Sequence, residues 1–186
     1  MTLDASKVRV AITGAVYFAA SSASAPANAT DPVPAGYRDV GFISEDGVTE
    51  AYEDDVEEIV AWQGATVVRT VLTSSEATLA FQMIETNKNS LELYHKGSEI
   101  TGPGPFVLKV KPPTQVRQKM IFDVIDGDKH IRIYIPDGEV KERGEIVYAS
   151  GEPVGYEVTV TAYPVADGDD QVVLYKYSDD EAWGAS

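Results

Sequence analysis

Alternating hydrophobic and polar residues recur in short runs along most of the chain. In residues 155–164, for example, Tyr156, Val158 and Val160 share one parity, and mostly polar residues stand between them. A period of two is typical of a β-strand with one buried face, because successive side chains point to opposite faces of a sheet. Many short strands separated by turns predict a mainly β fold, a β-sandwich or a barrel. We expect strands at residues 8–19, 37–44, 67–74, 77–85, 106–111, 118–125, 129–135, 145–149 and 155–164, with residues 171–177 as a last strand or an arm.

The clearest turn lies at residues 126–128, where the sequence reads Asp-Gly-Asp. Asp-Gly between two alternating segments is a strong hairpin signal, because both residues tolerate the left-handed conformation that tight hairpin turns require. Residues 118–125 and 129–135 are therefore expected to pair. Parity in the second strand places Ile131, Ile133 and Ile135 inward and His130, Arg132 and Tyr134 outward.

A single short helix is expected among the strands, at residues 87–97. Thr86 or Asn87 can cap its start, since a short polar side chain accepts hydrogen bonds from the free N–H groups of the first turn. Gly97 can close it, because glycine readily adopts the left-handed conformation that ends many helices. The predicted fold is thus a sheet structure with one short flanking α-helix.

Residues 45–64 do not follow the pattern of a core strand. From Glu45 to Glu58 the segment has eight acidic residues and no basic one, and an apolar tip with Ile59 and Trp62 follows directly. Loops of this length in compact domains usually have a function. We interpret the segment as a long loop or extended hairpin that docks on another molecule, with Ile59 and Trp62 as anchors. The alternative is a flap over the protein's own core, since buried tryptophan is common.

The length of the chain favours a single domain spanning residues 1–186. Residues 20–36 are rich in Ala, Ser and Pro, so we expect a flexible surface loop there. Residues 165–186 form an acidic C-terminal arm. The first 25 residues loosely resemble a signal peptide. However, Asp4 lies in the leader, and the alternation that follows favours a strand of the mature protein.

Charge narrows what the protein can bind. The chain has 30 acidic and 15 basic residues, which gives a formal net charge of −15 at pH 7. Proteins that grip DNA supply Lys and Arg to its phosphates, whereas this chain repels a polyanion at most approaches. It has no cysteine, so disulfides, thiolate nucleophiles and Cys-based zinc sites are excluded. No apolar run approaches the length that spans a bilayer, and we expect no membrane association.

The titratable residues do not form a recognisable catalytic combination. His95 falls on the expected helix and His130 on the outward parity of a strand, and neither has a metal-binding spacing. Carboxylates at residues 54–55, 126–128 and 167–170 could offer oxygen ligands to calcium, but none matches an EF-hand loop. Turns and solvated acidic faces explain them better. We therefore expect no catalytic, cofactor-binding or metal-binding residues and no enzymatic activity.

Several segments together resemble the major tail proteins, or tail tube proteins, of siphophages that infect actinobacteria. The resemblance spans roughly residues 7–164 and is a pattern over most of the chain. It rests on Gly-Phe-Ile-Ser-Glu-Asp-Gly-Val-Thr-Glu at 41–50 with Asp54 and Asp55, Ala-Trp-Gln-Gly at 61–64, Val-Val-Arg-Thr at 67–70, residues 79–85 before the expected helix, Asp-Val-Ile-Asp-Gly-Asp at 123–128, Arg-Ile-Tyr-Ile-Pro at 132–136, and residues 155–164.

This resemblance implies a β-sandwich tail tube fold and a structural function. Six copies of such a protein form a ring, and rings stack into a tube that conducts DNA during ejection. The implied partners are sister copies, a tape-measure protein, and the tail terminator and distal tail or baseplate proteins, while DNA passes through the lumen without specific binding. The implied location is the virion tail, after synthesis in the cytoplasm of the bacterial host. The loop at residues 45–64 then becomes the contact between rings, with Tyr52, Asp54, Asp55, Ile59 and Trp62 as candidate residues.

Two other classes of function remain open at this point. Related β-sandwiches recur in phage virions, so a neck or head-decoration protein is the nearest structural alternative. A secreted, calcium-dependent β-sandwich binding module is the other, and it predicts processing after Ala25. A hydrolase has no supporting group of residues.

Overall fold

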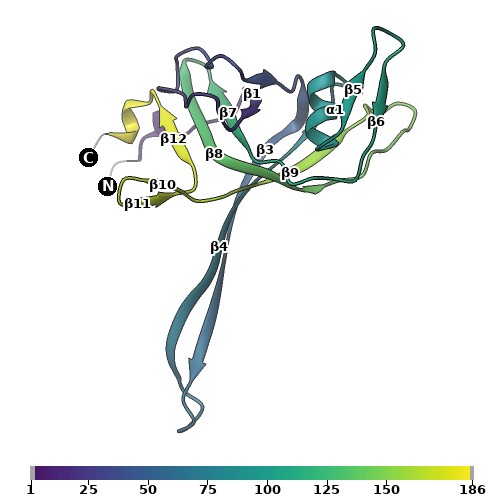
Figure 1. Cartoon of the computed structure of the whole chain (residues 1–186). Helices are drawn as coiled ribbons and strands as arrows, with labels where there is room; N and C mark the ends of the chain where they lie inside the picture. The colour runs from purple at the N-terminus through teal and green to yellow at the C-terminus, as the bar shows by residue number, and fades with distance from the viewer. Residues whose placement is uncertain (1–2, 185–186) are drawn as a thin grey trace.

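One antiparallel sheet of eight strands forms the body of the protein. The computed structural model describes residues 3–184, and Figure 1 shows the sheet with a helix beside it and a long hairpin that projects away from it. The strand order is β2-β1-β7-β8-β9-β4-β3, and β12 pairs with β8 outside this path. The strands are β1 (Thr13–Ala20), β2 (Arg38–Asp39), β3 (Ile43–Val60), β4 (Val67–Met83), β7 (Gln118–Asp126), β8 (Lys129–Arg143), β9 (Tyr156–Ala162) and β12 (Tyr175–Ser178).

The remaining elements are small. Two separate hairpins consist of β5 (Glu99–Thr101) with β6 (Val107–Lys109) and of β10 (Val165–Asp167) with β11 (Asp170–Val172), and the helices are α1 (Lys88–Tyr94) and two 3-10 turns at Ala5–Lys7 and Glu181–Trp183. Within residues 3–184, no helix combines the length and the apolar character that crossing a bilayer requires.

Strand β8 belongs to two layers, because its two halves have different partners. The first half pairs with β7 and β12, and the second half, from Gly138 onward, pairs with β9. The register between β7 and β8 shifts at this corner, as in a β-bulge. A Cβ on Gly138 would lie 3.1 Å from Ile135 and 3.3 Å from Val160, so glycine lets the layers approach closely there. The sheet therefore folds into a β-sandwich, with β2-β1-β7-β8-β12 in one layer and β8-β9-β4-β3 in the other.

The core lies between these two layers and is aliphatic and aromatic. Phe122 of β7 and Phe81 of β4 meet edge to face, with ring centroids 5.6 Å apart. Burial of such side chains is the main favourable contribution to folding. The large members of the core are Val16, Phe18, Met120, Phe122, Ile133 and Ile135 from one layer, and Leu79, Phe81, Met83, Val140, Tyr156, Val158 and Val160 from the other. The predicted mainly β, sandwich-type fold is confirmed.

Helix α1 flanks the sandwich and has a capping box at its start. The backbone N–H of Ser90 donates to Asn87 Oδ1 (2.9 Å), and the backbone N–H of Asn87 donates to Ser90 Oγ (3.0 Å), so both donors are satisfied. Leu93 and Tyr94 anchor the helix in the core. The helix ends at Tyr94, earlier than predicted, and Gly97 (φ +81°) lies beyond its end. The prediction of one short flanking helix is confirmed, and its end is corrected.

Several strand boundaries differ from those predicted. Strand β1 begins only at Thr13, and residues 8–12 precede it without belonging to a strand. The two strands predicted between residues 67 and 85 are one strand, β4, because residues 74–76 continue to pair with β3 instead of turning. Polar residues are tolerated there since that part of β4 is largely exposed. Residues 145–149 are not a strand, and β9 pairs with the second half of β8 instead.

Two further predicted strands are divided in the structure. Residues 37–44 contribute β2 and the start of β3, and Gly41, with φ +87°, redirects the chain between them. Residues 171–177 are shared by β11 and β12. The alternation of hydrophobic residues does not reveal where a glycine adopts the left-handed conformation, so it could not predict the division at Gly41.

The Asp-Gly hairpin between β7 and β8 is confirmed. Asp126 pairs with Lys129 across the turn, and Gly127 has the expected positive φ of +62°. Ile133 and Ile135 point into the core, as their parity predicts.

The opposite face of β8 is covered rather than exposed, which corrects the expectation for Arg132 and Tyr134. Arg132 is 4 % exposed and donates to the Asp123 carboxylate at 2.6 and 2.8 Å. Its remaining donors reach the main-chain carbonyls of Asn28 (3.1 Å) and Asp31 (2.8 Å) in the loop at residues 20–36. A buried cation needs such partners. The loop therefore lies over this face of the sandwich.

Replacing Phe122 by alanine tests this core. Phe122→Ala should lower the free energy of unfolding by about 3–5 kcal/mol, because it removes a fully buried ring and leaves a cavity. Phe42→Ala is the matched control: this ring is 75 % exposed, and its loss should change stability by less than about 0.5 kcal/mol. Urea unfolding of dilute protein measures both. Equal losses for the two variants would contradict the placement of the core.

Candidate functional site

The hairpin of β3 and β4 extends far beyond the sandwich. The two strands pair from Ile43↔Met83 at the body to Val60↔Val67 near the tip. From Tyr52 outward nearly all residues of both strands are exposed. Nine residues from Tyr52 to Val60, at a rise of about 3.3 Å each, give a projection of roughly 30 Å. Figure 1 shows this hairpin pointing away from every other element.

The predicted docking residues all lie on this hairpin, but not on one face. Tyr52 and Asp54 share one face of the two-stranded ribbon, since they are two residues apart in β3. Asp55 and Ile59 lie on the opposite face for the same reason. Trp62 belongs to the turn at the tip and is 96 % exposed. The alternative of a flap over the protein's own core is therefore wrong.

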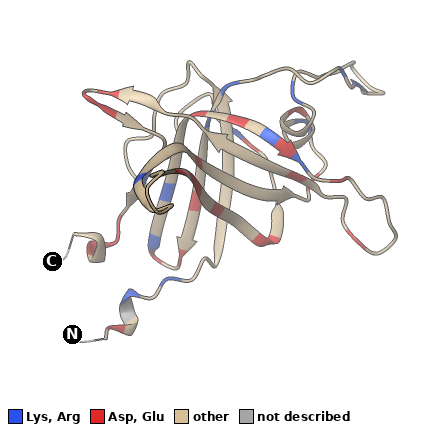
Figure 2. Ribbon diagram, turned by 90° about the horizontal axis from the view of Figure 1, so that it is seen from below, with Lys and Arg blue, Asp and Glu red and all other residues tan. Residues whose placement is uncertain are grey.

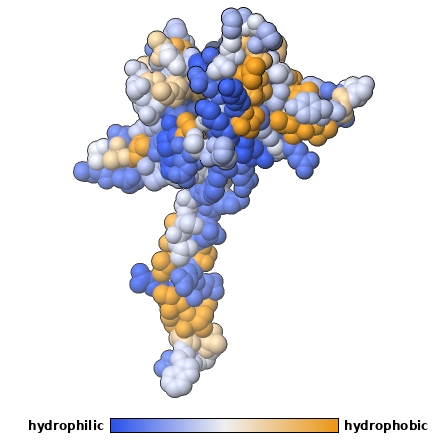
Figure 3. All heavy atoms as spheres, turned by 45° about the vertical axis from the view of Figure 1, so that its right-hand side comes forward, coloured by the Kyte–Doolittle hydropathy of each residue, from blue (hydrophilic) through white to orange (hydrophobic). Residues whose placement is uncertain are grey.

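An apolar stripe runs along one face of the hairpin, and the sequence-based prediction missed most of it. Val56 pairs with Leu72 and Val60 pairs with Val67, and directly paired residues point to the same side of a sheet. All four side chains are exposed, as is Tyr52 on the same face. We call these five residues the apolar stripe. Figure 3 shows the hydrophobic atoms gathered on the outer part of the hairpin.

Two ion pairs attach the base of the hairpin to the body. Lys141 Nζ donates to both Glu76 carboxylate oxygens (2.6 and 2.7 Å), and Thr161 Oγ1 donates to the same group (2.8 Å). These hydrogen bonds hold the pKa of the Glu76 carboxyl below its usual value, because they favour its charged form. On β3, Lys176 of β12 pairs with Glu50 at 2.7 Å.

Tyr52 marks the point where the hairpin leaves the body. Its hydroxyl donates a hydrogen bond to Glu50. Desolvation, and then this hydrogen bond, raise the pKa of Tyr52 to about 12. The phenol therefore stays a donor at physiological pH.

The outer part of the hairpin carries negative charge without internal compensation. The ion pairs within residues 3–184 do not include Glu53, Asp54, Asp55, Glu57 or Glu58. Arg69 is the single basic residue between positions 52 and 72. Like charges so close together repel one another, which favours a partner of opposite sign.

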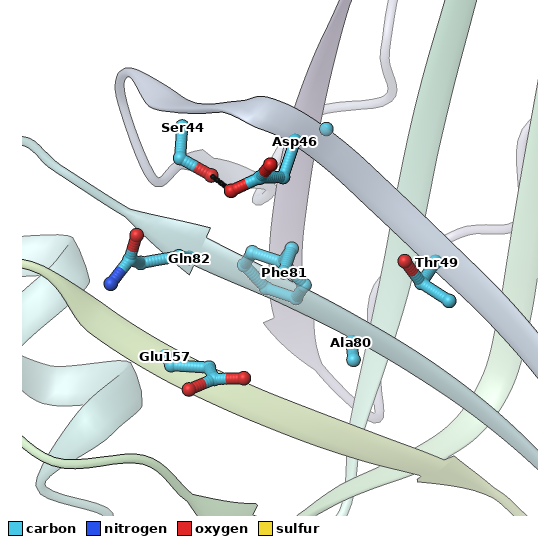
Figure 4. A pocket seen from close by; sticks show the side chains of 8 residues that line it. Ser44, Asp46, Thr49, Ala80, Phe81, Gln82 and Glu157 are labelled. Carbon is cyan, nitrogen blue, oxygen red and sulfur yellow. Dashed lines mark hydrogen bonds between the residues drawn. The ribbon is translucent and has the colours of Figure 1, made fainter.

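A small hollow lies beside the base of the hairpin. Figure 4 shows the side chains that line it, on β3, β4 and β9. Its volume is about 220 Å³. Ser44 Oγ lies 3.5 Å from Asp46 Oδ2, and Glu157 stands across from them. No histidine lines the hollow, so its side chains do not form a nucleophile with an oriented base.

The two histidines and the carboxylates are dispersed over the body. Burial, with a contribution from Arg143, lowers the pKa of His95, and His130 Nδ1 lies 3.2 Å from Asp179 Oδ2. Among residues 3–184, no three His, Asp or Glu side chains are grouped as a metal ion would need. The projecting hairpin is thus the feature that requires a functional explanation.

Comparison with known protein families decides the assignment. A model of the phage tail tube protein family matches residues 1–184. The chain belongs to the phage tail tube protein family. A comparison with curated protein sequences gave no match. Among solved structures, the chain is similar to a chain of the six-fold symmetrised cryo-EM structure of the anti-feeding prophage (AFP) baseplate, with a TM-score of 0.41, 10 % identity, and coverage of 95 % of this chain and 97 % of that chain.

Membership of the tail tube family settles the broad class of function. A tail tube protein is a structural component of the virion tail and not an enzyme, and it assembles with copies of itself and with other tail components. The predicted family, structural class and location in the tail are thereby confirmed. The relation to actinobacterial siphophages in particular stays a prediction.

Substitution of Glu76 tests the attachment of the hairpin. A carboxyl whose pKa is lowered on folding contributes stability above its unfolded pKa of about 4.5, and this contribution is lost as the pH falls through the lowered value. Glu76→Gln should therefore lower the melting temperature at pH 7 by no more than about 3 °C, since the pair is largely solvated. The difference from wild type should vanish at increasingly acid pH.

Glu57→Gln is the control for this experiment, because Glu57 lies on the exposed part of the same hairpin. Thermal melts across the pH range compare the three proteins. A Glu76→Gln deficit that stays constant into acid pH would contradict the assigned role of the Glu76 carboxylate.

Proposed function

We propose that the protein is the major tail tube subunit and that its copies form stacked rings, six to a ring, around the channel through which DNA leaves the capsid. Family membership supports a structural role in the tail. The projecting hairpin is the observation that carries the rest of the proposal. We assign to it the contact between successive rings.

The hairpin is poorly suited to a protein that remains monomeric. A two-stranded ribbon in water is marginally stable on its own. This one also exposes the apolar stripe and Trp62. Contiguous exposed apolar surface usually marks an interaction site. Docking on a neighbouring copy would bury the stripe and support the ribbon, so assembly accounts for both features.

Open sheet edges can supply contacts within a ring. Among the described strands, β12 pairs with β8 alone, β2 with β1 alone and β3 with β4 alone. Each such edge strand carries unpaired backbone N–H and C=O groups, which a monomer usually protects and which a neighbouring strand can satisfy. Sheets of adjacent subunits joined in this way would form a continuous wall.

The net charge suits a channel for DNA. At −15 per chain, a ring of copies repels phosphates at most approaches. A basic wall would instead bind the DNA backbone and slow its passage. We therefore propose that DNA slides through the lumen without specific binding.

Tail assembly requires further partners, and we propose the same ones that the sequence resemblance implies. These are a tape-measure protein within the tube, a tail terminator at one end, and distal tail or baseplate proteins at the other. We also propose synthesis in the cytoplasm of the bacterial host before assembly.

The proposed function predicts polymerisation of the purified protein. With increasing concentration, negative-stain micrographs should show rings or tubes. Trp62→Ala should raise the concentration needed for tubes by about 30-fold or more, since a central aromatic anchor contributes about 2 kcal/mol or more to an interface. Its melting temperature as a dilute monomer should not change, because this side chain is almost fully exposed.

Trp183→Ala is the matched control, because Trp183 is also exposed (53 %) but lies in the 3-10 turn near the C-terminus, outside the hairpin. It should assemble as the wild type does. A wild-type protein that stays monomeric at every concentration, and is missing from the tails of intact virions, would refute the proposal.

A further inference from the structure

The chain carries a basic segment in spite of its acidity. Residues 95–119 contain five of the 15 Lys and Arg residues and a single acidic residue, Glu99. Lys96 and Arg117 pair with Glu139, and Arg117 also pairs with Asp137, so their charges are compensated within the body. Lys109 and Lys111 are exposed, and no ion pair within residues 3–184 includes them. They leave positive charge on a protein of net charge −15.

These two lysines lie on a small projecting arm. We define the arm as residues 99–111, which comprise β5, β6 and the turn between them. It forms a two-stranded sheet separate from the sandwich. The arm exposes Phe106 in its turn, Val107 at the start of β6 and Val110 just after β6. Glu99 stands opposite Lys109 in the register, which places one carboxylate beside two lysines. Figure 2 shows the arm at the upper right, with the blue of its lysines.

The arm complements the face of the hairpin that bears the apolar stripe. On that face, Asp54 and Glu58 alternate with Val56 and Val60 along β3. The hairpin thus offers carboxylates with aliphatic side chains, and the arm offers ammonium groups with exposed aromatic and aliphatic side chains. Interfaces combine such complementary charge with an apolar centre.

The two surfaces lie at opposite ends of the molecule. Figure 1 shows the hairpin extending downward, whereas β5 and β6 project at the top. Within one copy they do not meet. Two copies stacked along the hairpin direction can bring the hairpin of one to the arm of the next. A contact between two different patches leaves one patch free on each terminal copy. Repeated along the hairpin direction, it therefore generates an extended stack and not a closed dimer.

We propose that the stripe-bearing face of the hairpin docks on the arm of the next copy of this chain along the tube, with Asp54 and Glu58 against Lys109 and Lys111. This inference rests on the proposed function and specifies the surface that receives the hairpin. The occupant of the arm is a second copy of this chain.

Charge reversal tests the pairing. Lys109→Glu with Lys111→Glu should raise the concentration needed for tube formation by about tenfold or more, because like charges then meet at every repeated contact. Asp54→Lys with Glu58→Lys should have the same effect. A chain with all four substitutions should regain assembly to within a few-fold of wild type.

The opposite face of the hairpin supplies the matched control. Glu53→Lys with Glu57→Lys makes the same change in net charge on the face without the stripe. Combined with the two lysine reversals, it should not restore assembly. Circular dichroism of each variant as a dilute monomer checks that it is folded.

A covalent trap gives a second readout that does not depend on charge reversal. The chain has no cysteine, so Glu58→Cys and Lys109→Cys introduce the only thiols. Oxidation of assembled tubes, with loss of two electrons and two protons per disulfide to an added oxidant, should join many copies into ladders on a non-reducing gel. Glu57→Cys with Lys109→Cys should give few such ladders.

The outcomes separate this inference from the function on which it rests. Wild-type tubes together with normal assembly of the lysine reversals, or strong ladders only from the Glu57 pair, would overturn the docking proposal and leave the tube function intact. Failure of the wild-type protein to polymerise would instead count against the tube function itself.

Discussion

The main-chain pairing of β3 with β4 extends from the buried core to the tip of the hairpin, with register shifts at three points along it. Strand β4 contributes Leu79, Phe81 and Met83 to the core, and its other end forms one side of the projecting ribbon. The direction of the ribbon is therefore set by packing inside the sandwich and not by a flexible linker. Everything inferred about contacts between copies depends on this continuity, because a loop hinged at the surface would present its side chains in many orientations.

The alternation of hydrophobic residues predicted the sandwich, the helix and the Asp-Gly hairpin, because each depends on neighbours in the sequence. The division of β8 between two layers could not be predicted in this way. It depends on the close approach of Gly138 to Val160 of β9, a residue distant in the chain. Burial of Arg132 under the loop at residues 20–36 has the same origin, since its main-chain partners lie about a hundred positions away.

The charge pattern of the sequence located the candidate site, but it did not predict how the side chains of the site are arranged. The acidic composition of residues 45–58 indicated an exposed, functional segment, and the structure places that segment on a hairpin. The apolar stripe needed the pairing of two strands. Register shifts near Thr73 and Val68 of β4 reverse its parity, so that strand's own alternation does not reveal which residues face Val56 and Val60. The signal available in the sequence was the shared parity of Tyr52, Val56 and Val60 in β3.

The separation of the hairpin and the arm to opposite ends of one subunit has a consequence for any filament built from it. Such a filament has a direction, and its two terminal surfaces are chemically different. One end displays acidic ribbons with aliphatic side chains, and the other displays lysine-bearing arms around an aromatic turn. A capping protein shaped for one terminus would face the wrong charge at the other, so growth could be stopped independently at each.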